Sequence, residues 1–216
     1  MSELLELLGA FAEEGDESYR RLWLTPPAEF KAPHCGMSMV GDLMASLPTP
    51  CVLHLGNSSA VRYSRLFPLP QGVQVECNRG VNGIEGSLST ALGYATADDR
   101  PMFLIIGDLS FFYDMNALWM NGITPNVRIL LLNNGCGGIF STIGTPNTDC
   151  VNAPHNATAE AWAISRGFEY RSVCNAEDWQ AALPVLLHYN EAPVLVEAFT
   201  DSKQDADIIK KFYSEH

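Results

Sequence analysis

Charged residues are scarce in this sequence, and basic ones are the scarcest. Only 18% of the 216 residues are charged, and 13 Lys and Arg stand against 25 Asp and Glu, which gives a formal net charge of −12. A surface this negative repels nucleic acid and anionic membranes, so we exclude both as partners. An anionic ligand would have to be held locally, by a metal ion, a helix N-terminus or a few placed arginines.

The sequence also lacks the patterns of disulfide frameworks, zinc sites and membrane spans. None of the six cysteines is paired as Cys-x-x-Cys, and the five histidines are scattered without ligand spacing. We therefore expect reduced thiols in a cytoplasmic protein. No apolar run approaches the length of a membrane helix, and residues 1–23 lack the basic start and the cleavage site of a signal peptide.

Apolar runs alternate with helical patterns after an acidic start. We interpret residues 1–35 as an acidic lead segment and linker, and residues 36–216 as one domain. Strands are expected at 51–55, 73–76, 102–106, 127–132, 168–173 and 194–199. Helices are expected at 37–47, 59–66, 85–96, 112–121, 157–166, 176–189 and 204–214.

The strand-like runs MFLII (102–106) and VRILLL (127–132) show no alternation of apolar and polar residues. Such runs are typical of strands that are buried on both faces of a parallel sheet covered by helices. The alternation of strand and helix favours right-handed crossovers. The sequence therefore predicts a three-layer α/β domain with a central, mainly parallel six-stranded sheet.

Small and polar segments follow four of the expected strands, where ligands bind in parallel sheets. Asp108 ends one buried strand and Asn134 ends the next, 26 residues later, which leaves room for one crossover helix and a return strand. A carboxylate and an amide oxygen side by side suit Mg²⁺ or Ca²⁺ and leave room for phosphate oxygens. The backbone amides of Leu109 and Ser110 would face the same anion, and nearby glycines would let a main-chain carbonyl near Cys136 complete the shell.

Each of these short motifs taken alone also fits an ordinary turn. The pair Gly41-Asp42 offers a comparison within the chain, because it lies inside an expected helix with no Asn pair at suitable spacing downstream. We interpret Asp42 as a surface residue. The joint pattern at 107–134 is more specific, since both halves fall at the ends of expected strands.

These motifs, in this order, resemble those of thiamine-diphosphate enzymes and, among them, the MenD family of menaquinone biosynthesis. The resemblance covers about residues 36–200 and rests on four segments, which are 56–62, 78–86, 107–118 and 133–140. Leu109 stands where many thiamine-diphosphate enzymes have a glycine. The resemblance implies a transferase that decarboxylates 2-oxoglutarate on thiamine diphosphate and adds the four-carbon carbanion equivalent to isochorismate.

The resemblance implies roles for individual residues. Asp108, Asn134 and the carbonyl of Cys136 would hold Mg²⁺ (or Mn²⁺) on the diphosphate. The other implied cofactor contacts are Ser58, Leu109 and Ser110 at the diphosphate, Asn82 and Gly83 at the aminopyrimidine, Ile84 as the wedge between the two rings, and Ile139 over the thiazolium. The implied substrate contacts are Arg62, Arg79, Ile139 and Phe140.

Several of these residues also fit structural roles. Ser58 suits a helix N-cap as well as a diphosphate contact. The apolar residues Ile84, Ile139 and Phe140 suit core packing. Arg62 and Arg79 could bind surface acids, although guanidinium groups also suit the carboxylates of both implied substrates.

The resemblance also implies parts that this sequence does not contain. The glutamate that activates thiamine diphosphate lies on a pyrimidine-binding domain, which precedes a middle domain, and neither domain resembles any segment here. We therefore expect no catalytic residue in this chain, an inactive isolated domain, and a homo-oligomer (dimer or tetramer) for the full-length enzyme.

Three alternatives stay open from the sequence. One is another thiamine-diphosphate 2-oxoacid decarboxylase or carboligase. The second is a non-catalytic phosphate-binding module, although the segment after strand 51–55 matches neither a P-loop nor Gly-x-Gly-x-x-Gly. The third is a degenerate domain that serves only as a scaffold, which the intact Asp108 and Asn134 argue against.

Overall fold

The structure is a computed structural model that describes residues 33–80, 82–143, 148–188 and 190–215. The predicted lead segment 1–35 therefore lies almost entirely outside the described residues. Within the described residues, no helix has the length and apolar character needed to span a bilayer.

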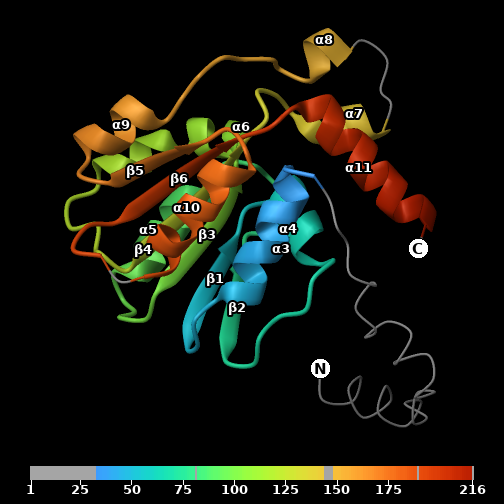
Figure 1. The fold of residues 1–216 in the computed structure, drawn as a ribbon. Coiled ribbons are helices and arrows are strands. Elements are labelled where there is room, and N and C mark those ends of the chain that lie inside the picture. The colour runs from blue at the N-terminus through green and yellow to red at the C-terminus, as the bar shows by residue number, and fades with distance from the viewer. Residues whose placement is uncertain (1–32, 81, 144–147, 189, 216) are drawn as a thin grey trace, which may run out of the picture. The chain divides into compact units, whose positions relative to one another are not determined.

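Six strands form one sheet in the described domain (Figure 1). They are β1 (Cys51–Leu55), β2 (Val73–Cys77), β3 (Met102–Gly107), β4 (Val127–Asn133), β5 (Glu169–Val173) and β6 (Val194–Phe199). Their order across the sheet is β2-β1-β3-β4-β6-β5, and every neighbouring pair is parallel. The predicted six-stranded parallel sheet is confirmed.

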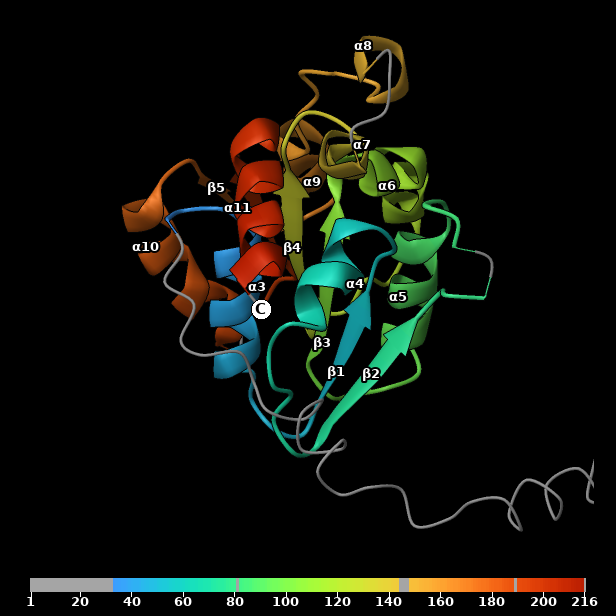
Figure 2. The ribbon, with the colours of Figure 1, turned by 90° about the vertical axis from the view of Figure 1, so that its right-hand side faces the viewer.

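Helices cover both faces of this sheet (Figures 1 and 2). One face carries α5 (Ser87–Ala95), α6 (Asp108–Tyr113), the 3-10 helix η1 (Met115–Trp119) and α9 (Glu160–Ser165). The other face carries α3 (Gly36–Ser46), α4 (Ser59–Ser64) and α10 (Ala176–Leu187). Beyond the sheet, α7 (Gly138–Ile143) packs against α11 (Ser202–Glu215), and α8 (Thr148–Val151) follows α7 in the chain. The three-layer prediction is thereby confirmed.

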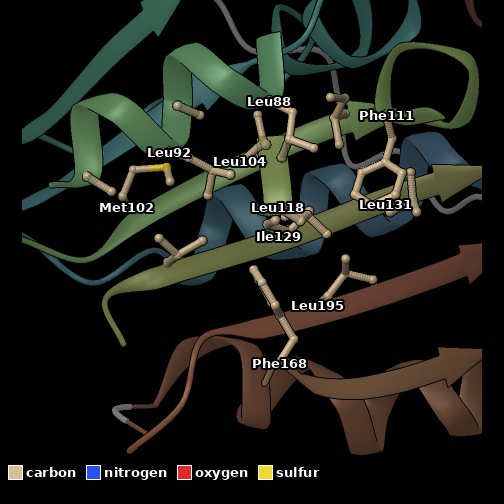
Figure 3. Packing of buried hydrophobic residues seen from close by; sticks show 14 of the residues in the cluster. Leu88, Leu92, Met102, Leu104, Phe111, Leu118, Ile129, Leu131, Phe168 and Leu195 are labelled. Atoms are coloured by element: carbon tan, nitrogen blue, oxygen red, sulfur yellow. The ribbon is translucent and has the colours of Figure 1, made fainter. Parts of the chain in front are cut away.

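The central strands are buried along their length, which explains their unbroken apolar sequences. In Figure 3, Leu104 of β3 packs against Leu88 and Leu92 of α5, and Ile129 of β4 lies beside Leu118 of η1. Each fully buried side chain of this kind stabilises the fold by about 1.5–3 kcal/mol. The edge strands β2 and β5 are partly exposed and are more polar. The core thus holds β3 and β4 in register, with Gly107 opposite Leu132, so that both strands end at the same edge.

The helix predicted at 112–121 was wrong in its bounds. The structure begins α6 at Asp108, directly after β3, and ends it at Tyr113. Asp114 then interrupts the helix, and its carboxylate accepts hydrogen bonds from the backbone amide and hydroxyl of Ser89, at 2.7 and 2.9 Å. Only the 3-10 helix η1 remains of the predicted C-terminal part.

Other helix bounds also differ from the prediction. Two short helices, α7 and α8, were not predicted; α7 follows a glycine-rich turn, where helix propensity is poor, and α8 is only four residues long. Helix α5 starts at Ser87 rather than at residue 85, and α9 starts at Glu160 rather than at 157.

Candidate functional site

The topology of the sheet places a binding site between β1 and β3. From these neighbouring strands the chain proceeds in opposite directions, β1 toward β2 and β3 toward β4. Ligands bind in the crevice outside the carboxyl ends of strands at such a switch point. A cavity lies there in this structure. Its lining includes Asn57, Ser58, Ile84, Asp108, Leu109, Ser110, Asn134, Cys136, Gly138, Ile139 and Phe140.

The carboxylate of Asp108 is the only charged group among the residues predicted to bind cofactor, and it is buried. One of its oxygens accepts a hydrogen bond from the backbone amide of Leu109 at 2.7 Å, and the other accepts one from that of Gly135 at 2.8 Å. The Nε2 atom of His155 lies 3.3 Å from Asp108 Oδ2. Burial nevertheless raises the pKa of the Asp108 carboxyl, because it outweighs these favourable contacts. A cation next to this carboxylate would stabilise its charged form.

Asn134 lies in the tight turn that follows β4. Its side-chain oxygen accepts a hydrogen bond from the backbone amide of Cys136 at 3.2 Å. Gly135 has a φ of +74°, in the left-handed region that favours glycine. A Cβ atom on Gly138 would lie 2.5 Å from Asn134 Nδ2, so a larger residue at position 138 would displace this amide from its present position. The turn therefore holds the Asn134 side chain and the Cys136 backbone at the cavity wall.

The oxygens at this wall fit a hard divalent cation. They are a carboxylate, a side-chain amide and the backbone carbonyl of Cys136, which accepts a hydrogen bond from the Gly138 amide at 3.0 Å. Oxygen donors of this kind suit Mg²⁺, which keeps several waters or phosphate oxygens in its shell. In the part of the chain that the structure describes, no three His, Cys, Asp or Glu side chains cluster as a metal site. A cation here would therefore depend on oxygens from a bound ligand.

Ser58 lies between β1 and α4 in an unusual backbone conformation. Its φ of 69° and ψ of −126° are rarely adopted by residues other than glycine. It occupies the N-cap position of α4, but its side chain makes no capping hydrogen bond. The N-cap interpretation is therefore not supported, and the Ser58 side chain lies at the cavity wall instead.

A second cavity adjoins the first and contains the predicted arginines. Arg62 and Arg79 line it together with Ser58, Asn82, Ile84 and Ile139, and three of these six also line the first cavity. Both arginines are exposed. Among the described residues, neither guanidinium lies within ion-pair distance of a carboxylate, whereas Arg100 and Arg171 both do. The expectation that surface acids could bind these two arginines is not met here.

Ile84 lines both cavities. Ile84 is half-buried, and its backbone carbonyl accepts a hydrogen bond from the Ser110 hydroxyl. Asn82 has a φ of 56° and an exposed side chain. Phe140 lines only the first cavity, whereas Ile139 lines both. The structure thus brings all the residues predicted for cofactor and substrate to this edge of the sheet, except that Gly83 lines neither cavity, and their roles stay predictions.

Three further residues at the site were not predicted. Asn57 is buried and donates hydrogen bonds to the backbone carbonyls of Asn78, at 2.8 Å, and of Gly83, so it joins the end of β1 to the glycine segment. Its place in the motif beside Ser58 was a usable signal. His155 and the buried Asp205, which lines the first cavity, come from distant segments without a sequence signal.

Comparison with known proteins identifies the class to which this fold and site belong. The profile of the family described as "Thiamine pyrophosphate enzyme, C-terminal TPP binding domain" matches residues 56–198. The chain belongs to this family. The thiamine-diphosphate fold predicted from the motifs is therefore confirmed.

Individual relatives show which thiamine-diphosphate enzymes the chain resembles. The chain is 44% and 45% identical to proteins of Bacteroides thetaiotaomicron and Bacteroides fragilis that are named 2-succinyl-5-enolpyruvyl-6-hydroxy-3-cyclohexene-1-carboxylate synthase. Each match covers 98% of this chain and 40% of the relative. A synthase of the same name from Christiangramia forsetii is 35% identical over 84% of the chain and 32% of its own length. The resemblance to MenD synthases is thus confirmed, and the chain spans about 40% of the length of the two Bacteroides relatives.

Proposed function

We propose that this chain is the diphosphate-binding domain of a 2-succinyl-5-enolpyruvyl-6-hydroxy-3-cyclohexene-1-carboxylate synthase. The complete enzyme would decarboxylate 2-oxoglutarate and add the resulting four-carbon unit to isochorismate. The observation that carries this proposal is that Asp108 and Asn134, at the ends of the adjacent strands β3 and β4, line one cavity. The relatives of that name supply the choice of reaction.

Asp108, Asn134 and the Cys136 carbonyl would hold Mg²⁺ (or Mn²⁺) against the diphosphate. When bound, thiamine diphosphate supplies the electron sink on which a 2-oxoacid loses carbon dioxide. Ser58, Leu109 and Ser110 would orient the diphosphate, and the segment Asn82–Ile84 would fix the bend between the two rings. The oxygen donor set and the buried charge of Asp108 support this assignment.

Arg62 and Arg79 would bind the carboxylates of 2-oxoglutarate and isochorismate, with Ile139 and Phe140 shaping the pocket. The support is that both arginines line a cavity adjoining the cofactor cavity and have no carboxylate within ion-pair distance among the described residues. A hydrogen-bonded charge contributes about 1.5–3 kcal/mol, so we expect Arg79→Ala to raise the KM for a substrate about 10–100-fold in the complete enzyme.

Arg171→Ala is the matched control, because Arg171 lies on the edge strand β5 and pairs with Glu169 at 2.6 Å. Steady-state kinetics with 2-oxoglutarate and with pyruvate should show a preference for 2-oxoglutarate. A preference for pyruvate would instead support another carboligase of the same class. An unchanged KM in Arg79→Ala would remove Arg79 from the substrate site.

The complete enzyme would also carry the pyrimidine-binding and middle domains and would act as a cytoplasmic homo-oligomer. The further domains are supported by the fact that the chain matches only about 40% of the length of the two Bacteroides relatives. Because the activating glutamate would lie on the pyrimidine-binding domain, we expect no catalytic residue in this chain and no turnover by the purified 216-residue chain. Steady formation of product from 2-oxoglutarate and isochorismate by this chain alone would contradict the proposal.

A further inference from the structure

A buried carboxylate lies behind the turn that carries Asn134. Glu197 is on β6, opposite Leu131 of β4, and its side chain is 0% exposed. Its oxygens accept hydrogen bonds from Asn133 Nδ2 at 2.7 Å, from the Ala159 backbone amide at 3.0 Å and from the Tyr170 hydroxyl at 2.8 Å. Among the described residues, no Lys, Arg or His lies within ion-pair distance of it. Neutral donors from three separate segments therefore bind this charge.

Asn133 links Glu197 to the candidate metal site. Its side-chain oxygen accepts a hydrogen bond from the Gly135 backbone amide at 3.1 Å, and the same amide donates to Asp108 Oδ2 at 2.8 Å. An amide side chain has a donor at one end and an acceptor at the other, whereas a carboxylate only accepts. Glu197 therefore requires Nδ2 of Asn133 to face it, which turns Oδ1 of Asn133 toward Gly135.

Glu197 also holds a second segment against the same turn. Its bond to the Ala159 amide fixes one end of residues 155–159, and Asn133 Nδ2 binds the Ala157 carbonyl at 3.0 Å. At the other end, the His155 backbone amide donates to the Gly135 carbonyl at 2.9 Å. This segment places the His155 ring at Asp108. One buried carboxylate thus orients both stretches of chain that contact Asp108 from the β4 side.

We propose that Glu197 is a positioning residue for the cation and diphosphate site, acting through Asn133 and the Gly135 turn. The inference rests on the proposed function, because that function assigns Asp108, Asn134 and the Cys136 carbonyl to the cation. Outer-shell partners that orient metal ligands typically change metal affinity by about 10–100-fold when they are removed.

The test uses the complete enzyme and titrates thiamine diphosphate at fixed Mg²⁺, and then Mg²⁺ at fixed thiamine diphosphate. We expect Glu197→Ala to raise the dissociation constants about 10–100-fold, and activity to recover at high Mg²⁺ and cofactor. Glu197→Gln should remain within about threefold of wild type, because its amide oxygen still accepts from Asn133, and the Tyr170 hydroxyl can turn to accept from its nitrogen.

Tyr170→Phe is the matched control, since it removes the hydrogen bond that the Tyr170 hydroxyl of β5 donates to Glu197 and leaves the bond from Asn133 in place. We expect it to lower the midpoint of thermal unfolding and to leave both dissociation constants unchanged. The inference is overturned if Glu197→Ala binds as wild type does, or if Tyr170→Phe weakens binding as much as Glu197→Ala.

Should Glu197→Ala fail to fold, Asn133→Ser takes its place, because it breaks the same link while Glu197 keeps Ala159 and Tyr170. Wild-type affinity in Asn133→Ser would overturn the inference. Failure of the proposed function has a different signature, in which the wild-type enzyme does not bind the cofactor or Asp108→Ala binds it normally.

Discussion

Replacing Asp108 with asparagine should separate ligand binding from folding. The substitution keeps the shape of the side chain and removes a carboxyl group whose pKa is raised by burial. The NH2 end of the new side chain must face a backbone N–H group, of Leu109 or of Gly135, and two donors facing each other cost about 1–3 kcal/mol. The substitution also removes the desolvation penalty of a buried carboxylate, which offsets this cost by a similar amount. We therefore expect the unfolding free energy of the ligand-free protein to change by less than about 2 kcal/mol.

The effect on ligand binding should be much larger. At a free ligand concentration of about 100 times the dissociation constant, Mg²⁺ and thiamine diphosphate would stabilise the wild-type enzyme by about 2.7 kcal/mol. Loss of the Asp108 carboxylate as a metal ligand should weaken binding by at least about 100-fold, since the loss of residues that only orient metal ligands can reach that value. The same concentration would then stabilise Asp108→Asn by about 0.4 kcal/mol or less.

The assay is thermal unfolding of the complete enzyme with and without Mg²⁺ and thiamine diphosphate, supported by calorimetric titration. Asp42→Asn is the matched control, because Asp42 also follows a glycine but is exposed and accepts a hydrogen bond from Trp179 Nε1 at 2.9 Å. It should keep the full ligand-induced stabilisation, and a metal chelator should abolish that stabilisation in wild type. If Asp108→Asn also keeps it, the proposed metal site is wrong.

Two further predictions concern the fold. Gly93 is exposed inside α5, and no atom lies within 4 Å of a Cβ placed there. Gly93→Ala should therefore raise the unfolding free energy, measured by urea denaturation, by about 0.5–1 kcal/mol. A loss of stability would contradict the helical geometry at this position. Burial raises the pKa of the Cys51 thiol to about 11, so roughly 0.1% is thiolate at pH 8. A thiol reagent should therefore modify the exposed Cys174 well before Cys51, whose reactivity should appear only on unfolding or as the pH approaches 11, and equal rates would show that β1 is not buried.

The sheet was predictable because its central strands carry unbroken apolar runs. The bounds expected for 51–55 and 194–199 match β1 and β6, and the other strands differ by one residue at one end. Asp108 and Asn134 were predictable as neighbours because consecutive parallel strands end at one edge of a sheet.

Side-chain links between distant segments were not predictable from the sequence. Glu197 binds Asn133 across 64 residues, and His155 meets Asp108 from a loop with no motif of its own. The short helix α7 was not predicted because the glycines at and before its first residue disfavour a helix, whereas packing against α11 stabilises it in the fold. The early start of α6 was missed because no loop separates it from the strand: Gly107 is the last residue of β3 and Asp108 is the first of α6.

The backbone conformation of Ser58 destabilises the fold, whereas its position places a hydroxyl group at both cavities. A non-glycine residue in such a conformation costs about 1–3 kcal/mol, so glycine at this position should make the chain more resistant to heat. Glycine would also delete the hydroxyl that lies between the two cavities. Directed evolution for heat resistance alone would therefore tend to select glycine at position 58, and a screen that preserves ligand recognition must score binding at the same time.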